Sequence, residues 1–145
     1  VTLAVSSTAQ PAPEVTLHRL DGTPVTLSAL SEDRLTLVNL WASWCPPCRR
    51  EMPVLEQGQS DYPGVRFVYA NQGESAEIIR GYLLEEGLRL DNVVSDPHSD
   101  LARGLGGSGL PTTVLIGRDG TLVNSHVGPL SRASLHHFIN PHLQE

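Results

Sequence analysis

The segment that leads from residue 35 to the paired cysteines constrains the fold more than any other part of the chain. Leu35-Thr-Leu-Val-Asn-Leu-Trp41 is a nearly continuous apolar run, which is typical of a strand buried on both faces of a sheet. Shortly afterwards Pro46 stands where a helix can begin, because a missing N–H costs nothing in the first helical turn. A strand buried on both faces needs covering layers on both sides, so the segment predicts an α/β fold.

Turn residues and apolar periodicity place the other elements around this strand. We expect two short strands joined by an Asp-Gly turn within 17–27, strands at 65–70, 92–95, 112–116 and 121–127, and helices from 46 to about 60, 75–86, 99–105 and 131–139. The second of these helices is expected to bury one face that consists of Ile78, Ile79, Tyr82 and Leu83, and to stop at Gly87. The order predicts a central mixed β-sheet flanked by helices, with a terminal hairpin.

Composition excludes several classes of function. The chain has 145 residues, of which 39% are hydrophobic, so we expect a single domain. The net charge of −6 argues against nucleic acid as a partner. All ten cationic side chains are arginines, which excludes a Schiff-base lysine and a phosphate loop of the Walker type. No apolar run approaches the roughly 20 residues of a membrane span.

The N-terminal residues differ in composition from the rest of the chain. The chain opens with Val1-Thr-Leu-Ala-Val5, which lacks a charged leader, so no intact signal peptide is visible. The small, polar and proline-containing residues 6–14 are typical of a tether. We therefore expect residues 1–13 to be a tether or a leader remnant and residues 14–145 to be the domain. A merely frayed terminus is the alternative.

The two cysteines of the chain, Cys45 and Cys48, allow three interpretations. As a structural disulfide they would close a loop of about four residues, which contributes only about 2 kcal/mol against about 4.7 kcal/mol for a loop of 100. A zinc site normally needs four ligands, and the sequence has neither a second CxxC nor a histidine pair spaced as in a zinc finger. A copper site formed by both thiolates and His126 stays open.

Redox chemistry is the third interpretation, and the local sequence favours it. Cys45 falls at a helix start, where unpaired N–H groups and the helix dipole stabilise an anionic sulfur. Because Pro46 and Pro47 carry no N–H, the first backbone donor that can point back at the Cys45 sulfur is that of Cys48. A stabilised thiolate makes Cys45 a nucleophile and a good leaving group. Cys48, one turn into the helix, is suited to resolve a mixed disulfide.

Several motifs in order resemble one known family. Val38-Asn-Leu-Trp-Ala-Ser-Trp-Cys-Pro-Pro-Cys-Arg-Arg-Glu-Met-Pro53, the Asp-Gly hairpin before it, Asn71-Gln-Gly-Glu-Ser75 and Gly109-Leu-Pro-Thr-Thr113 are similar to the TlpA/ResA/CcmG (DsbE-like) family. The resemblance covers residues from about 14 to 140. It implies a thioredoxin-like fold with an added N-terminal β-hairpin. It also implies a periplasmic or otherwise extracytoplasmic protein, usually anchored to the membrane.

The resemblance also implies roles for residues around the cysteines. Pro111 corresponds to the family's cis-proline, and Leu110 before it would contact substrate through its main chain. Asn39 stands where ordinary thioredoxins have a buried aspartate, so another group must carry protons. Glu51 is one candidate, and its alternative is a solvated carboxylate paired with a neighbouring arginine or with nothing. Glu74 is the second, and its alternative is an acidic residue in the first turn of a helix.

The expected activity is thiol–disulfide exchange. Cys45 would attack a partner's disulfide, Cys48 would resolve the mixed disulfide, and Trp44, Pro46, Pro47, Leu110 and Pro111 would bind the substrate. The resemblance implies reduction of cell-envelope proteins such as apocytochrome c. With no G-x-G-x-x-G fingerprint for NADPH or flavin, we expect no cofactor and a membrane thiol protein of the DsbD/CcdA kind as electron donor. The alternatives are a copper chaperone, a redox-inert interaction domain and a disulfide-introducing oxidant.

Overall fold

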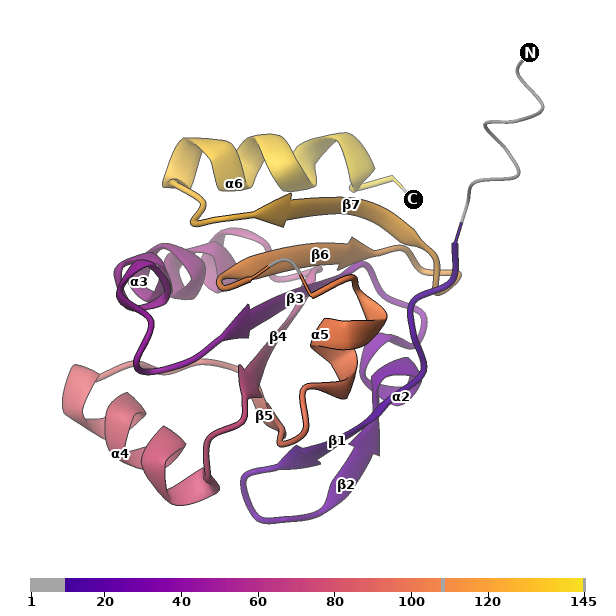
Figure 1. Cartoon of the computed structure of the whole chain (residues 1–145). Coiled ribbons are helices and arrows are strands. Elements are labelled where there is room, and N and C mark those ends of the chain that lie inside the picture. Colours follow the sequence, from indigo (N-terminus) through magenta and orange to yellow (C-terminus); the bar gives the residue numbers. More distant parts are fainter. Residues whose placement is uncertain (1–9, 108, 145) are drawn as a thin grey trace.

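One mixed sheet forms the centre of the molecule. A computed structural model describes residues 10–107 and 109–144 (Figure 1). Its seven strands lie in the order β2-β1-β5-β4-β3-β6-β7. β3 pairs in parallel with β4, and β4 with β5, whereas the other neighbours are antiparallel. The strands are β1 Thr16–Arg19, β2 Pro24–Thr26, β3 Thr36–Trp41, β4 Arg66–Gln72, β5 Asn92–Asp96, β6 Thr112–Ile116 and β7 Leu122–Val127. This confirms the predicted mixed sheet with an N-terminal hairpin.

Helices connect the strands and cover both faces of the sheet. Every predicted helix is present, and Ser75 and Ser131 cap two of them by accepting the N–H of the residue three positions on. The helices are α2 Leu27–Ser31, α3 Pro46–Asp61, α4 Ala76–Glu86, α5 Asp100–Gly104, α6 Arg132–Ile139 and the 3-10 turn η1 Asn140–His142. The short helix α2 was not predicted from the sequence.

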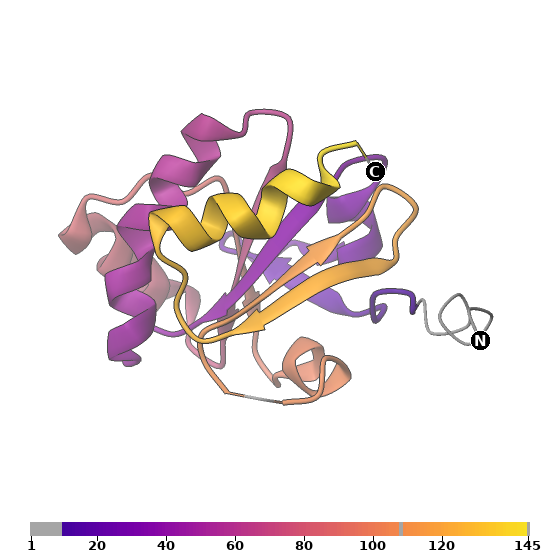
Figure 2. The ribbon, with the colours of Figure 1, turned by 90° about the horizontal axis from the view of Figure 1, so that it is seen from above.

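Alternate residues of the central strand face two different cores. Every residue of β3 is buried. Leu37 and Trp41 pack in the core formed with α3, α4 and α6, whereas Val38 and Leu40 pack in the core formed with α2 and α5. Figure 2 shows α3 and α6 on one side of the strands and α5 on the other. Asn39, which alternates with Leu37 and Trp41, therefore faces α3.

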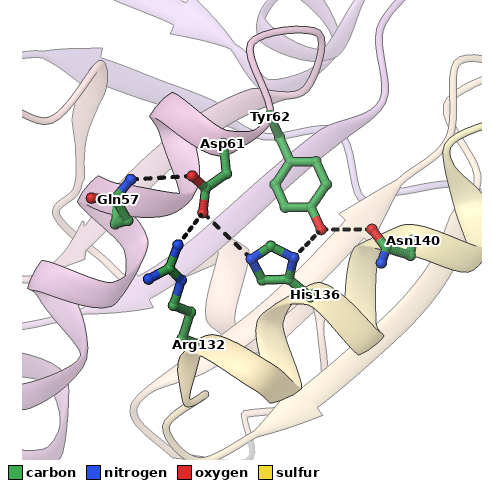
Figure 3. A network of polar contacts seen from close by, with 6 residues as sticks. All are labelled: Gln57, Asp61, Tyr62, Arg132, His136 and Asn140. Atoms are coloured by element: carbon green, nitrogen blue, oxygen red, sulfur yellow. Dashed lines mark hydrogen bonds and ion pairs between the residues drawn. The ribbon is translucent and has the colours of Figure 1, made fainter.

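A cluster of polar side chains ties the end of α3 to α6 (Figure 3). The Tyr62 hydroxyl donates to Asn140 Oδ1 at 2.6 Å and lies 2.9 Å from His136 Nδ1. His136 Nε2 in turn lies 3.4 Å from Asp61 Oδ2, and Arg132 lies 3.8 Å from the same oxygen. These contacts hold α6 against the C-terminal end of α3, and they thereby place the loop that precedes α6.

Only residues 10–13 of the predicted tether lie within the described part of the chain. Residues 1–9 lie outside it, whereas Ala12 N donates to Gly120 O at 2.8 Å and Leu122 N donates to Gln10 O at 2.9 Å. The segment that begins at Gln10 therefore runs along the β6–β7 turn. Within the described ranges, none of the helices combines the length and the apolar character needed to cross a membrane.

Candidate active site

The cysteine pair occupies the first turn of α3. Cys45 is the N-cap of the helix, with Pro46 and Pro47 in its first two positions. Cys45 and Cys48 form a disulfide, and the Cys48 N–H donates to Cys45 Sγ at 3.3 Å. The predicted geometry is thus confirmed: the first available N–H of the helix points at the Cys45 sulfur. Cys48 is fully buried and Cys45 is 4% exposed.

Glu74 fastens the loop that precedes Cys45. Its two carboxylate oxygens accept hydrogen bonds from Ser43 N at 2.7 Å and from Ser43 Oγ at 2.6 Å, and Asn71 Nδ2 donates to one of them at 2.8 Å. Glu74 precedes Ser75, the N-cap of α4, and the acidic residue in the first turn of that helix is Glu77. The interpretation of Glu74 as a first-turn residue was therefore wrong.

Glu51 lies inside the protein, one turn after Cys48 on α3. Its side chain is 1% exposed, and its oxygens accept hydrogen bonds from Asn39 Nδ2 at 3.1 Å and from Leu130 N at 2.7 Å. Burial raises the pKa of Glu51 from 4.5 to about 7, and the bonds from Leu130 and Asn39 oppose the rise. The alternative of a solvated carboxylate was wrong.

Arg49 forms a second brace around the active-site loop, which was not foreseen from the sequence. Its Nη1 donates to Ser43 O at 3.1 Å, its Nη2 lies 3.3 Å from Glu86, and its guanidinium carbon lies 5.0 Å from the centre of the Tyr82 ring. The Tyr82 ring packs at 5.3 Å from the Trp41 ring. Arginines near acidic residues are common in helices, so the sequence does not predict that Arg49 would contact Ser43, Glu86 and Tyr82 together.

An apolar cavity lies against Trp44, the residue that precedes Cys45. It has a volume of about 270 Å³, and both Trp44 and Leu110 line it. Trp44 is 67% exposed next to buried Cys45, so an apolar surface is available to a partner. The lining also includes Gln72, Ala102 and Leu105, which the sequence did not single out because they come from β4, α5 and the residue after α5.

The three prolines predicted to bind substrate differ in exposure. Pro46 is exposed and Pro47 is half-buried, whereas Pro111 is buried. The Leu110–Pro111 peptide bond is cis, which confirms the expectation from the resemblance. The Pro111 carbonyl accepts the Gly128 N–H at 2.8 Å, so the loop after β7 holds the main chain at this position.

His126, the residue considered for copper, packs against an aromatic ring. Its imidazole lies edge-on to Phe138, with ring centres 6.4 Å apart. In the part of the chain that the structure describes, no group of three or more histidine, cysteine or acidic side chains is arranged to hold a metal ion. The geometry therefore gives the copper interpretation no support.

Comparisons with known proteins agree with this site. The Redoxin family profile matches residues 7–137. The thiol:disulfide interchange protein CycY of Rhizobium leguminosarum bv. viciae is 34% identical over 84% of the chain and 65% of its own length. The corresponding protein HelX of Rhodobacter capsulatus is 32% identical over 90% of the chain and 73% of its own length. The chain thus spans about two thirds of these curated relatives.

Solved structures include a thiol:disulfide interchange protein of the thioredoxin family from Chlorobium tepidum TLS, with a TM-score of 0.77 and 29% identity over 93% of this chain and 97% of that one. The predicted thioredoxin-like fold is thereby confirmed. The disulfide at the start of α3 is the kind of group that thiol–disulfide interchange requires. The chain belongs to the Redoxin family, in which its relatives are thiol–disulfide oxidoreductases.

Proposed function

We propose that this protein is a thiol–disulfide oxidoreductase that reduces disulfides of cell-envelope proteins through Cys45 and Cys48. The observation that carries the proposal is the Cys45 sulfur at the N-cap of α3, where it accepts the Cys48 N–H at 3.3 Å. A helix start stabilises the thiolate over the thiol. Trp44, largely exposed beside it, offers an apolar contact to the partner.

The reaction proceeds in two exchanges. In the dithiol form, the Cys45 thiolate attacks one sulfur of the partner's disulfide, and the partner's other sulfur leaves as a thiolate. Cys48 then loses its proton and attacks Cys45 Sγ, which releases the partner's second sulfur. Two electrons pass to the partner, and the chain is left with the Cys45–Cys48 disulfide that the structure contains.

Glu51 is the group proposed to take the Cys48 proton. It lies one turn after Cys48 on the same helix and, like Cys48, is buried. Its pKa of about 7 is close to neutrality, where a general base works best. Glu74 is less suited, because it is only half-buried and its carboxylate accepts three hydrogen bonds that hold the loop at Ser43, against two at Glu51.

The partner is proposed to bind across the first turn of α3 and the adjoining cavity. Trp44 and Leu110 line this cavity, Pro46 and Pro47 border the sulfur, and Pro111 follows Leu110 through the cis bond. These groups suit an extended, apolar segment next to a disulfide, as in apocytochrome c.

The proposed cycle needs a thiol donor outside the cytoplasm. The chain has no fingerprint for a nicotinamide or flavin cofactor, so electrons must arrive by another disulfide exchange. A membrane thiol protein of the DsbD/CcdA kind fits this requirement. An extracytoplasmic location, with a membrane tether in the full-length protein, follows the same resemblance.

The direction is tested by the equilibrium reduction potential of the Cys45–Cys48 pair in glutathione buffers. We expect a value below about −220 mV, as for a reductant kept charged by a donor. A value near −120 mV would instead identify an oxidant that introduces disulfides.

Single cysteine variants test the order of the steps with a disulfide-containing peptide as substrate. Cys45→Ser should abolish exchange. Cys48→Ser should accumulate a mixed disulfide through Cys45, detected as a mass adduct. Ser60→Ala, an exposed change on the same helix that keeps both thiols, is the control. Full activity of both cysteine variants would contradict the scheme.

A further inference from the structure

A buried amide faces the proposed proton carrier. Asn39 is fully buried in β3. Its Nδ2 donates both hydrogens, one to Glu51 Oε1 and one to Thr113 Oγ1, each at 3.1 Å. Its Oδ1 is buried and has no hydrogen-bond partner among the described residues. An unpaired carbonyl in this position costs about 1–3 kcal/mol, so its retention calls for an explanation.

The other oxygen of Glu51 is restricted to one role. Oε2 accepts the Leu130 N–H at 2.7 Å, and a backbone N–H can only donate. Oε2 therefore remains an acceptor whether Glu51 is charged or neutral. In a neutral carboxyl group the carbonyl oxygen is the better acceptor, so with Oε2 bonded to the Leu130 N–H we place the proton of neutral Glu51 on Oε1, the oxygen that faces Asn39.

The amide orientation seen in the structure fits the charged form of Glu51 better than the neutral form. A proton on Oε1 would meet the hydrogens of Asn39 Nδ2, so two donors would face each other. A half-turn of the amide brings Oδ1 to the place of Nδ2. An amide oxygen accepts two hydrogen bonds, and a threonine hydroxyl can either donate or accept. After the turn, Oδ1 accepts from both Glu51 Oε1–H and Thr113 Oγ1–H.

We propose that Asn39 is a positioning residue whose amide reverses when Glu51 gains or loses its proton. The inference deepens the proposed function and rests on the role of Glu51 in it. In each orientation the amide makes two hydrogen bonds and leaves its other end unpaired. Because neither protonation state loses a bond, Glu51 can take the Cys48 proton and give it back.

Nuclear magnetic resonance of the oxidised wild-type protein tests this directly, since the disulfide removes the cysteines from the titration. We expect nuclear Overhauser effects from the Asn39 side-chain NH₂ to the Thr113 methyl and the Glu51 methylenes above the Glu51 midpoint. Below it they should weaken several-fold, with the same midpoint as the Glu51 carboxyl carbon. Unchanged effects on both sides of the midpoint would overturn the proposal.

Glu51→Gln supplies a variant locked in the neutral state. The Leu130 N–H requires an oxygen at the Oε2 position, so the new NH₂ group faces Asn39 as the proton of a neutral Glu51 would. The Asn39 signals of this variant should match the low-pH wild type at every pH. Signals that match the high-pH wild type instead would contradict the reversal.

Kinetics separate this inference from the proposed function. Asn39→Leu should slow the Cys48-dependent step at least about tenfold and flatten its pH profile, while Cys45 attack is unchanged. Thr36→Val, a buried change on the same strand, is the control. If exchange fails to depend on Glu51 but the amide still reverses, the proton role in the proposed function is wrong. If exchange depends on Glu51 and the amide stays fixed, only the inference is wrong.

Discussion

At the scale of single residues, two glutamates near the cysteines have different surroundings. Glu51 is buried and has a pKa raised to about 7 by its burial. Both carboxylate oxygens of Glu74 accept hydrogen bonds from Ser43, in the loop that precedes Cys45. The sequence alone did not distinguish the two residues, because both belong to motifs that resemble the same family. Their contacts and burial fit Glu51 for the proposed proton exchange and Glu74 for holding the main chain.

The raised pKa of Glu51 makes stability depend on pH. In the folded protein the pKa is about 7, against 4.5 ordinarily. Between these values the folded state binds more protons than the unfolded state, so stability falls as pH rises. Glu51 contributes on the order of 3 kcal/mol to the free energy of unfolding. This contribution is fully present below pH 4.5 and is lost above about pH 7.

Glu51→Gln should remove this dependence. Urea unfolding of the oxidised protein at pH 5 and pH 8 measures it. From pH 5 to pH 8, we expect the free energy of unfolding of the variant to rise by on the order of 3 kcal/mol relative to that of the wild type. An identical pH dependence in both proteins would show that Glu51 titrates normally.

Glu74→Gln should destabilise the fold without changing proton chemistry. A charge-assisted hydrogen bond contributes about 1.5–3 kcal/mol, and the Glu74 carboxylate accepts three bonds from Ser43 and Asn71. We expect a loss of about 2 kcal/mol in urea unfolding, with the pH profile of exchange keeping its shape. Glu77→Gln, at an exposed position in the first turn of α4, is the control. A shifted profile would move the proton role to Glu74.

At the scale of elements, α4 allows a matched pair of glycine substitutions. Gly87 ends the helix with φ of 66°, a conformation that side chains disfavour. Gly81 lies in the helix interior, where alanine is the better residue. A Cβ at either position meets no atom within 4 Å, so sterics do not interfere.

Gly87→Ala should destabilise the protein by about 1 kcal/mol, and Gly81→Ala should stabilise it by about 0.5–1 kcal/mol. Thermal or urea unfolding of the two single variants checks both signs. Equal effects in the same direction would contradict the left-handed helix end at Gly87.

Element prediction failed where tertiary packing decided the outcome. Ile78 was expected on the buried face of α4, yet it is 51% exposed, because Ile79 and Tyr82 make the contact with the core. The helix Leu27–Ser31 was missed, since its first leucine continues the apolar pattern of the preceding strand. Its burial against the second face of the sheet selects the helical conformation.

At the scale of the whole molecule, the contacts of the N-terminal segment bear on where the folded domain begins. Residues 10–12 bond to the β6–β7 turn, and Pro13 packs so closely on Gly104 that an added Cβ would lie 2.9 Å from it. The free energy of unfolding of a chain that starts at Glu14 should therefore be about 1–2 kcal/mol lower than that of a chain that starts at Gln10. Equal urea midpoints for the two chains would place the boundary at residue 14.

The sequence by itself determined the class of fold, the order of the elements and the reactive pair. These follow from local physics: a run such as Leu35–Trp41 must be covered on both faces, and Cys45 before two prolines must meet the N–H of Cys48. Both signals lie within one short segment, so no long-range contact is needed to interpret them.

Only the tertiary structure decided what surrounds that pair. Glu51 receives its environment from Asn39 on β3 and from Leu130 before α6, and the cavity beside Trp44 is completed by Leu110. These partners are far apart in the chain and carry no local signal. The protonation of a buried carboxyl depends on which donors the fold brings to it and how completely it excludes water, and both are properties of the packed molecule.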